Sequence, residues 1–484
     1  MKSNRAISNR IPISVRASLG LFVANLITKG IAYLTTPIFT RIMSSYEYGR
    51  VAVFTTWLTI FGYLAMFCLS AGVFNNGMSD YPKKRDEYSL SMLVLSNVIT
   101  LVFSFLIIIV YPWIASYLKI DFWLIILMCL IFLFQPAYNF WYTRQRYEYK
   151  YKNVILATSV SAFFSQLISI LCVLFLDGDK DFLKIVGSEL PLIIFYAFFY
   201  FYLFKKADSK LETKYWKAAI VFNLPLLPHY LSTYLLSSAD KIMISNFIGD
   251  NATAFYTIAH SVASVALIVW SAINGSLLPF IYEKCKRNEF DKIDKASKPI
   301  ILFFAVVCFA IILFAPEVIK IMATKEYYES IYVIPPIICG VFFQVQYYLY
   351  ANVLFYYKKP IYVMIGSISA FIINIILNVC FIPTYGYVAA GYTTLISYLI
   401  QAIIDYIAMK KIIKVDIYDG KFILILSLLV VITAMFTNFI YELTIVRYII
   451  LVAIALFAFI FRKKIIAFLN FNKPMDYNVR KRNY

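Results

Sequence analysis

The sequence predicts an all-α polytopic membrane protein with about 14 transmembrane helices. Three observations support this prediction. Of the 484 residues, 62% are hydrophobic, apolar stretches of about 20 residues recur along the chain, and the polar connections between them are short. A β-barrel would instead alternate over segments of roughly ten residues. The connections leave no room for a soluble catalytic domain, so we expect the protein to act among its helices.

The apolar runs define the expected spans in order. They cover residues 18–42, 51–75, 89–111, 122–142, 153–176, 182–204, 218–248, 252–282, 299–323, 331–357, 360–382, 387–409, 421–440 and 446–461. The first run follows a polar, basic stretch and has no small-residue cleavage site, so we expect a retained helix and not a removed signal peptide.

Lysines and arginines are concentrated in every second connection along the chain. An even number of spans puts both termini on one side, and the segments on that side hold most of the 45 Lys and Arg residues. By the positive-inside rule, both termini are expected in the cytoplasm. The net charge of +19 is therefore explained by topology, and no nucleic-acid partner is expected. No cysteine pair has a metal-type spacing, so no metal site is predicted. No cofactor and no catalytic residue is predicted either.

A short internal echo predicts two lobes. The segment TRIM at 40–43 ends the first span, DKIM at 240–243 lies late in the seventh, and a polar turn with a glycine follows each. This favours two six-helix lobes related as parallel repeats. The predicted division is a cytoplasmic tail 1–17, an N-terminal lobe 18–204, a cytoplasmic loop 205–217, a C-terminal lobe 218–411, two appended helices 412–461 and a basic cytoplasmic tail 462–484.

Three charged residues fall deep within predicted spans. Lys29 lies about 16 Å into the first span, where a lysine costs about 2.5–3.5 kcal/mol without a partner or water. Asp240 and Lys241 are adjacent in the seventh span, and neighbouring helix residues point roughly 100° apart, so each needs another partner or a wet cavity. A structural ion pair between helices and a functional site both remain open.

Other ionisable residues give a weaker signal. His229 follows Pro225 and Pro228, which are expected to break the seventh helix. Glu189 and His260 fit structural and functional roles equally. Asp405 precedes Lys410 by only five residues, and we expect a shallow carboxylate that is satisfied at the membrane interface.

Three segments resemble one family. The stretch NLPLLPHYLSTYLLSSADKIMISNFIGDNATAFYTIAHSV (223–262) resembles the seventh helix and following turn of bacterial polysaccharide-export flippases. These O-antigen and capsule repeat-unit flippases form the polysaccharide transporter branch of the multidrug/oligosaccharidyl-lipid/polysaccharide exporter superfamily. TKGIAYLTTPIFTRIMSSYEYG (28–49) is similar to the family's first helix, and NIILNVCFIPTYGYVAAGYTTLISYLI (374–400) to its eleventh and twelfth. Together these anchors extend along nearly the whole chain.

The resemblance implies two lobes around a central cleft and a cargo of undecaprenyl-diphosphate-linked oligosaccharide repeat units. The cargo would pass from the cytoplasmic to the outer leaflet for O-antigen, capsule or exopolysaccharide synthesis, by alternating access coupled to a proton or sodium gradient. It would bind at Lys29, Lys241 and Asp240. Arg41 would meet either the cargo head group or lipid phosphate. The candidates for ion coupling are Asp240, His229, His260 and Glu189.

The expected location is the bacterial inner membrane, and the expected partners are membrane lipids, a polysaccharide polymerase and a chain-length regulator. One departure from the family is that 51–75 and 252–282 contain no Lys or Arg, so the cationic lining would be thinner than in relatives. The alternative is an ion-coupled multidrug or metabolite antiporter of the same superfamily, against which the deep lysines argue. A membrane enzyme is not expected.

Overall fold

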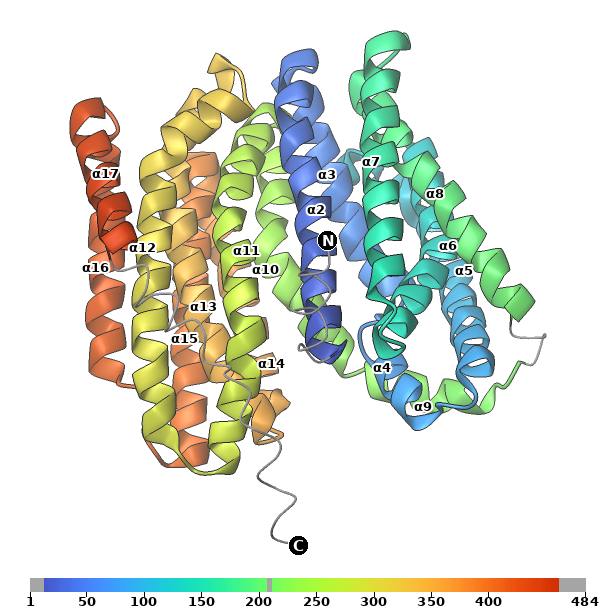
Figure 1. Cartoon of the computed structure of the whole chain (residues 1–484). Helices are drawn as coiled ribbons and strands as arrows, with labels where there is room; N and C mark the ends of the chain where they lie inside the picture. Colours follow the sequence, from blue (N-terminus) through green and yellow to red (C-terminus); the bar gives the residue numbers. More distant parts are fainter. Residues whose placement is uncertain (1–12, 207–210, 461–484) are drawn as a thin grey trace, which may run out of the picture. The chain divides into compact units, whose positions relative to one another are not determined.

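The computed structural model describes residues 13–206 and 211–460, and this part of the chain is helical without a strand (Figure 1). Most of the predicted N-terminal tail, part of the 205–217 loop and the tail 462–484 lie outside it. The helices are α2 (Ile13–Ile42), α3 (Ser45–Ala65), α4 (Val73–Asp80), α5 (Arg85–Leu118), α6 (Phe122–Tyr147), α7 (Tyr151–Phe175), α8 (Lys180–Lys206), α9 (Lys214–Asn223), α10 (Leu226–Phe247), α11 (Asp250–Lys286), α12 (Phe290–Met322), the 3-10 helix η1 (Lys325–Val333), α13 (Ile334–Tyr356), α14 (Pro360–Tyr385), α15 (Tyr387–Ile413), α16 (Gly420–Ile440) and α17 (Thr444–Ile460).

Every predicted span overlaps helical residues, although 51–75 crosses the break between α3 and α4 and 218–248 the break between α9 and α10. Within the described residues, 11 helices are long and apolar enough to cross a membrane, and α9 with α10 forms a further span bent by 46°. The two remaining runs correspond to α3, which is less apolar, and to the shorter α17. The predicted class, a multi-pass α-helical membrane protein, is confirmed.

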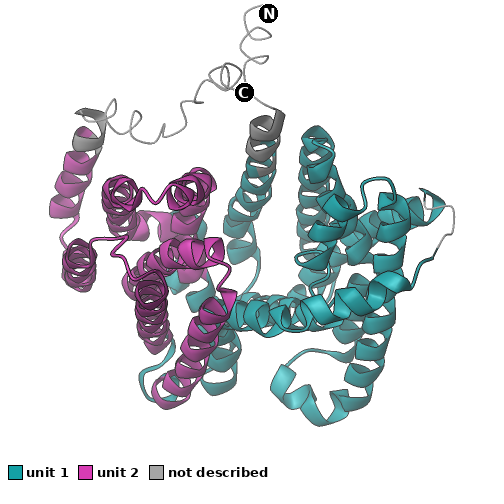
Figure 2. Ribbon diagram, turned by 90° about the horizontal axis from the view of Figure 1, so that it is seen from below, with its two compact units in different colours: residues 1–257, 321–327, 382–387 teal, residues 258–320, 328–381, 388–484 magenta. Residues whose placement is uncertain are grey.

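The chain forms two compact units (Figure 2). Unit 1 comprises residues 1–257, 321–327 and 382–387, and unit 2 comprises 258–320, 328–381 and 388–484. Helices α9 and α10, which the sequence assigns to the C-terminal lobe, pack within unit 1. The predicted six-helix lobes therefore stay a prediction.

Two spans of unit 1 are broken, and one side chain joins the breaks. Between α3 and α4 the chain turns through Phe67 and Cys68, whose φ angles are 52° and 51°. The break between α9 and α10 falls at Pro225, where proline removes a helical hydrogen bond, as the sequence predicts. Asn223 is buried there, donates to the Phe67 carbonyl at 3.0 Å and accepts from the Val73 amide at 3.1 Å.

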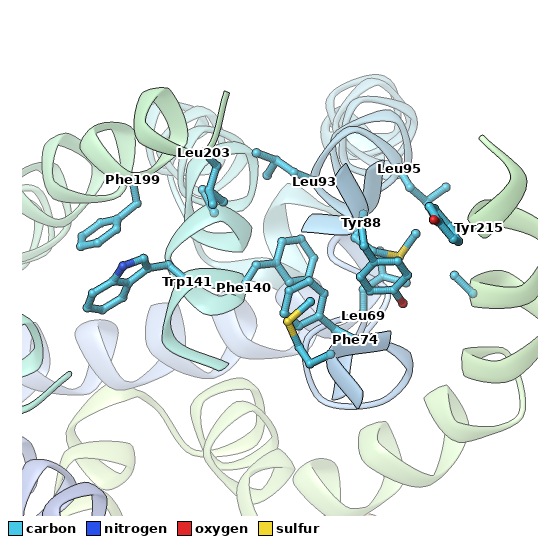
Figure 3. Packing of buried hydrophobic residues seen from close by; sticks show 14 of the residues in the cluster. Leu69, Phe74, Tyr88, Leu93, Leu95, Phe140, Trp141, Phe199, Leu203 and Tyr215 are labelled. Carbon is cyan, nitrogen blue, oxygen red and sulfur yellow. The ribbon is translucent and has the colours of Figure 1, made fainter. Parts of the chain in front are cut away.

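An aromatic core lies beside these breaks (Figure 3). Phe74 of α4 stacks on Phe140 of α6 with ring centroids 4.4 Å apart, and Tyr88 of α5 meets Tyr215 of α9 edge to face at 5.1 Å. These contacts add about 0.5–1.5 kcal/mol each to the area that the rings bury. The core thus stabilises α4 and α9, which are too short to span a membrane alone.

An ion cluster joins the ends of α5 and α6, on the side predicted to be cytoplasmic. Arg144 contacts Asp86 at 2.5 Å and Glu148 at 2.6 Å, and Lys150 also contacts Glu148 at 2.6 Å. Burial favours the neutral acid, but hydrogen bonds from Lys150 and Arg144, and their charges, lower the pKa of Glu148 to about 2.

In unit 2, α13 is the most enclosed helix, with nearly all its residues buried. Arg447 of α17 is only 2% exposed and binds Glu317 of α12 through two nitrogen–oxygen contacts at 2.9 and 2.6 Å. Such a bidentate pair gives geometric specificity as well as attraction. It joins the last described helix to α12 within unit 2.

Candidate functional site

The two echoed segments lie against each other in unit 1. They are spaced so that Gly49 corresponds to Gly249, 200 residues later. Gly49 packs on the backbone of Asp250, where an added Cβ would stand 1.9 Å from the carbonyl oxygen. Beside this contact, the Ser45 hydroxyl donates to the Asn251 side-chain oxygen at 3.2 Å. The first turn of α3 therefore meets the first turn of α11, and at Gly49 no side chain intervenes.

A cavity of about 680 Å³ opens at these turns. Arg50 and Lys119 line it, yet both cations already have protein partners. Arg50 contacts Asp121 and Asp181, each at 3.1 Å, and Lys119 donates to the Ser245 carbonyl at 2.5 Å. The charge of Arg50 is offset by two carboxylates, whereas Lys119 is engaged by a neutral carbonyl. This cavity is therefore less suited to an anion than its arginine and lysine suggest.

Asp240 is wholly enclosed near the end of α10. Its carboxylate accepts a hydrogen bond of 2.5 Å from the hydroxyl of Tyr256 on α11, which is also fully buried. A buried carboxylate is costly unless such donors satisfy it. The contact fixes Asp240 between α10 and α11, on the side of the helix that faces the protein.

Lys241 is half-buried beside this carboxylate. The charge of Asp240 acts on its ammonium group, while the Thr253 hydroxyl donates to its backbone carbonyl at 3.3 Å. Because neighbouring residues leave a helix roughly 100° apart, the two side chains do not face each other directly.

Lys29 lies midway along α2 and is exposed. Seven residues later on the same helix face, Thr36 forms a side-chain hydrogen bond with Tyr48 of α3. Lys29 thus shares the polar face of α2 that leads toward α3. Helix α3 in turn packs against α10, the helix that carries Asp240 and Lys241.

The remaining predicted residues are more scattered. Arg41 is exposed at the end of α2 and donates to the carbonyls of Pro37 at 2.6 Å and Ile321 at 3.2 Å. His229 and Glu189 are half-buried in α10 and α8 of unit 1. His260 belongs to unit 2, where the Ser264 hydroxyl lies 3.4 Å from its Nδ1 atom.

The structure shows a polar interface between α3 and α10 that was not predicted from the sequence. The Tyr234 hydroxyl forms side-chain hydrogen bonds with Thr56, Thr59 and Ser238, and the Tyr234 ring lies 5.7 Å from that of Tyr63. Aromatic residues are so frequent in this chain that composition alone does not distinguish them. Threonines spaced three residues apart on one helix face were the available signal.

Two family models match the chain. That of the polysaccharide biosynthesis proteins matches residues 14–285, more than half of the chain, and that of the MatE family matches residues 225–380. The first covers α2 through most of α11, and so includes Lys29, Asp240 and Lys241.

Two known proteins match parts of this chain at low sequence identity. A protein of the Lsg locus of Haemophilus influenzae is 23% identical over 189 residues, which are 37% of this chain and 46% of that protein. A Haloferax volcanii protein named "Probable low-salt glycan biosynthesis flippase Agl15" is 21% identical over 175 residues, 35% of this chain and 37% of its own length. The chain therefore matches less than half of either relative.

The fold matches that of a solved flippase. The lipid II flippase MurJ in an inward closed conformation superimposes with a TM-score of 0.61 at 15% identity, over 93% of this chain and all of MurJ. At that identity the likeness shows a shared fold and not a shared substrate.

Proposed function

Because the chain belongs to the polysaccharide biosynthesis protein family, we propose that it is a flippase for undecaprenyl-diphosphate-linked oligosaccharide repeat units. The cargo passes from the cytoplasmic to the outer leaflet of the bacterial inner membrane, where O-antigen, capsule or exopolysaccharide is assembled. Both termini lie in the cytoplasm, and a polymerase and a chain-length regulator act on the delivered units. The named flippase among the relatives supports a transporter and not an enzyme.

The observation that carries this proposal is the pair of lysines on α2 and α10. Lys29 is exposed on a polar helix face, and Lys241 is half-buried beside a fully buried carboxylate. A lysine at such depth is rare unless it serves a pathway or a partner. Together with Asp240 the two lysines carry a net charge of +1, which suits a transient contact with a diphosphate.

Asp240 sets the strength of that contact. Its bond to the Tyr256 hydroxyl holds the carboxylate beside Lys241 at the junction of α10 and α11. Without cargo, Asp240 offers a lysine a counter-charge, and the diphosphate competes for the same lysine. The carboxylate therefore prevents binding so tight that the cargo could not leave.

An ion gradient returns the empty carrier in this scheme. The candidate coupling groups are Asp240, His229, His260 and Glu189, among which a histidine titrates nearest to neutral pH. Arg41 lies at the end of α2 and interacts with phosphate groups of the cargo or of lipids.

Deletion of the gene in its host tests the proposal. Surface polymer and undecaprenyl-diphosphate oligosaccharide are quantified after complementation with the wild type, Lys29→Ala, Asp240→Asn or Lys241→Ala. Lys83→Ala, in an exposed loop, is the matched control for loss of a positive charge. We expect the deletion strain to lose polymer and to accumulate the complete lipid-linked unit, with rescue by the wild type and the control only.

Two outcomes would contradict the proposal at different levels. Normal polymer after deletion, in a host without a second flippase, would reject the flippase. Rescue by all three charge variants would retain the flippase but assign Lys29, Asp240 and Lys241 to structural roles. Protein levels in the membrane are measured for each variant, so that poor expression is not mistaken for lost transport.

The match to the MatE family over residues 225–380 favours one second candidate, an ion-coupled multidrug or metabolite antiporter. This candidate predicts normal polymer in the deletion strain together with greater sensitivity to a cationic compound. The same strains therefore discriminate the two functions.

A further inference from the structure

Asp405 of α15 lies fully buried in unit 2, and neither of its carboxylate oxygens has a hydrogen-bond partner. The sequence suggested a shallow carboxylate because Lys410 follows closely. In the structure α15 continues to Ile413, two turns beyond Asp405, and Lys410 instead contacts Asp416 at 2.9 Å. The expected partner is thus engaged elsewhere, and the aspartate is left inside the bundle.

A neighbouring helix closes over this carboxylate. An added Cβ at Gly366 of α14 would stand 2.9 Å from Oδ1 and 3.0 Å from Oδ2. Only a residue without a side chain leaves room for both oxygens at this crossing. The close approach of α14 shields Asp405 from its surroundings and explains its burial.

The other groups around Asp405 supply no cation. Helix α13 contributes Tyr347, whose hydroxyl is close enough to sense the charge of Asp405. On α15 the adjacent titratable residue in the sequence is Tyr406, whose ring packs on Tyr350 at 5.4 Å. Within the described residues, no lysine, arginine or histidine lies within ion-pair distance of Asp405. An ionised carboxylate here would be unpaired.

A second unsatisfied group lies one helical turn away. Gln401, four residues before Asp405, is 1% exposed, and its side-chain oxygen has no donor. Side chains four residues apart in a helix are neighbours. A protonated carboxyl group is a hydrogen-bond donor, whereas a carboxylate only accepts. A single proton on Asp405 would therefore remove the unpaired charge and give the Gln401 oxygen a donor.

We propose that Asp405 is a proton-binding site of unit 2, in which the carboxyl O–H donates to the side-chain oxygen of Gln401. The carboxylate takes one proton from water and becomes neutral, and it returns that proton when the site is hydrated. Burying an unpaired carboxylate is so costly that such groups neutralise instead. A metal cation fits less well, because hard cations bind about six oxygens and only three unsatisfied ones meet here.

The packing also indicates how the proton is released. Separation of α14 from α15 at Gly366 would admit water, and hydration favours the charged form of a carboxyl group. The site would then lose its proton on one side of the membrane. Its use in driving transport rests on the proposed function, whereas the presence of the proton does not depend on any cargo.

Infrared spectroscopy of the purified full-length protein in lipid nanodiscs tests the site. A protonated carboxylic acid has a C=O stretching band that is separate from the bands of carboxylates and amides. We expect this band in the wild type at neutral pH and its loss in Asp405→Asn. Asp416→Asn, which alters the exposed aspartate beside Lys410, is the matched control and should leave the band unchanged. Gln401→Leu should shift the band, because the hydrogen bond to the acid is lost.

The outcomes separate the possible occupants. The proposal would be overturned if the wild type showed no Asp405-dependent carboxylic acid band at neutral pH. It would also be overturned if the band disappeared when sodium replaced choline in the buffer, because that result would assign a sodium site. Asp405→Asn mimics the neutral acid and should fold with unchanged thermal stability, so misfolding of this variant would also contradict the proposal. A failed flippase assay would leave the spectroscopic result intact.

Discussion

Replacement of Gly49 by alanine should destabilise unit 1, because this glycine marks the contact between the two echoed turns. The new methyl group would lie 1.9 Å from the carbonyl oxygen of Asp250 and 2.6 Å from its carbonyl carbon. Ordinary contact begins at 3.4 Å, so the two backbones would have to separate by roughly 1.5 Å. Both neighbouring atoms belong to the backbone, and no side-chain rotation can relieve the overlap.

The magnitude follows from two opposing effects. Alanine is the better helix former and would stabilise α3 by about 0.5–1 kcal/mol if nothing else changed. Overpacking of a close contact costs typically about 1–3 kcal/mol, and occasionally more. Separation of the turns would also stretch the hydrogen bond between Ser45 and Asn251. We therefore expect Gly49→Ala to lower the free energy of unfolding by about 2 kcal/mol.

The assay is denaturant-induced unfolding of the purified protein in detergent, followed by circular dichroism. Gly30→Ala and Gly275→Ala are the matched controls, because an added Cβ at either position meets no atom within 4 Å. These variants should equal or exceed the stability of the wild type. If Gly49→Ala is as stable as the controls, the two turns do not approach as closely as the structure indicates.

Three further predictions concern stability. Asn223→Ala should cost about 1–3 kcal/mol, because two partly buried backbone groups at the helix breaks lose their partner; exposed Asn153→Ala should be neutral in the same unfolding assay. The ion pairs that lower the pKa of Glu148 to about 2 stabilise the fold fully above about pH 4.5 and lose this effect as the pH falls toward 2. Glu148→Gln should thus melt below the wild type at neutral pH, and the gap should close upon acidification. Arg447→Leu should cost about 3 kcal/mol because Glu317 loses its partner, and the double variant Arg447→Leu/Glu317→Leu should recover part of that loss.

Features set by local sequence were predictable. Hydropathy located the helices because a spanning segment must satisfy its backbone internally. The break before α10 followed from Pro225, which cannot donate a backbone hydrogen bond. The turn after α10 followed from Gly249, whose φ of 129° suits glycine alone among the common residues. In each case the cause lies within a few residues of its effect.

Features that depend on distant partners were not predictable. The break after α3 carries no proline, and its carbonyl at Phe67 and amide at Val73 are satisfied by Asn223, about 150 residues later. The sequence likewise gave no indication that Asp240 bonds to Tyr256 across a turn. Burial of Asp405 depends on Gly366 of another helix. The expectation from the sequence used only the distance along α15 from Asp405 to Lys410, and such a distance does not reveal burial by a neighbouring helix.

A comparison of the two copies of the echoed segment distinguishes what packing requires at each position from what the proposed function requires. Thr40 corresponds to Asp240, and its hydroxyl donates to the Met322 carbonyl at 2.8 Å. In the first copy of the motif, a neutral hydrogen-bonding side chain is therefore sufficient for packing at this position. Arg41 corresponds to Lys241, but it is exposed and interacts with carbonyls at the end of α2, where the helix dipole favours a cation.

Asp240 and Lys241 occupy more costly surroundings than their counterparts. The carboxylate is fully buried and the ammonium group half-buried, although the first copy builds the same junction without a buried charge. Packing alone therefore does not require this pair of charges. It follows that neutral variants at these two positions should preserve the fold and impair transport, whereas variants at Gly49 should impair both.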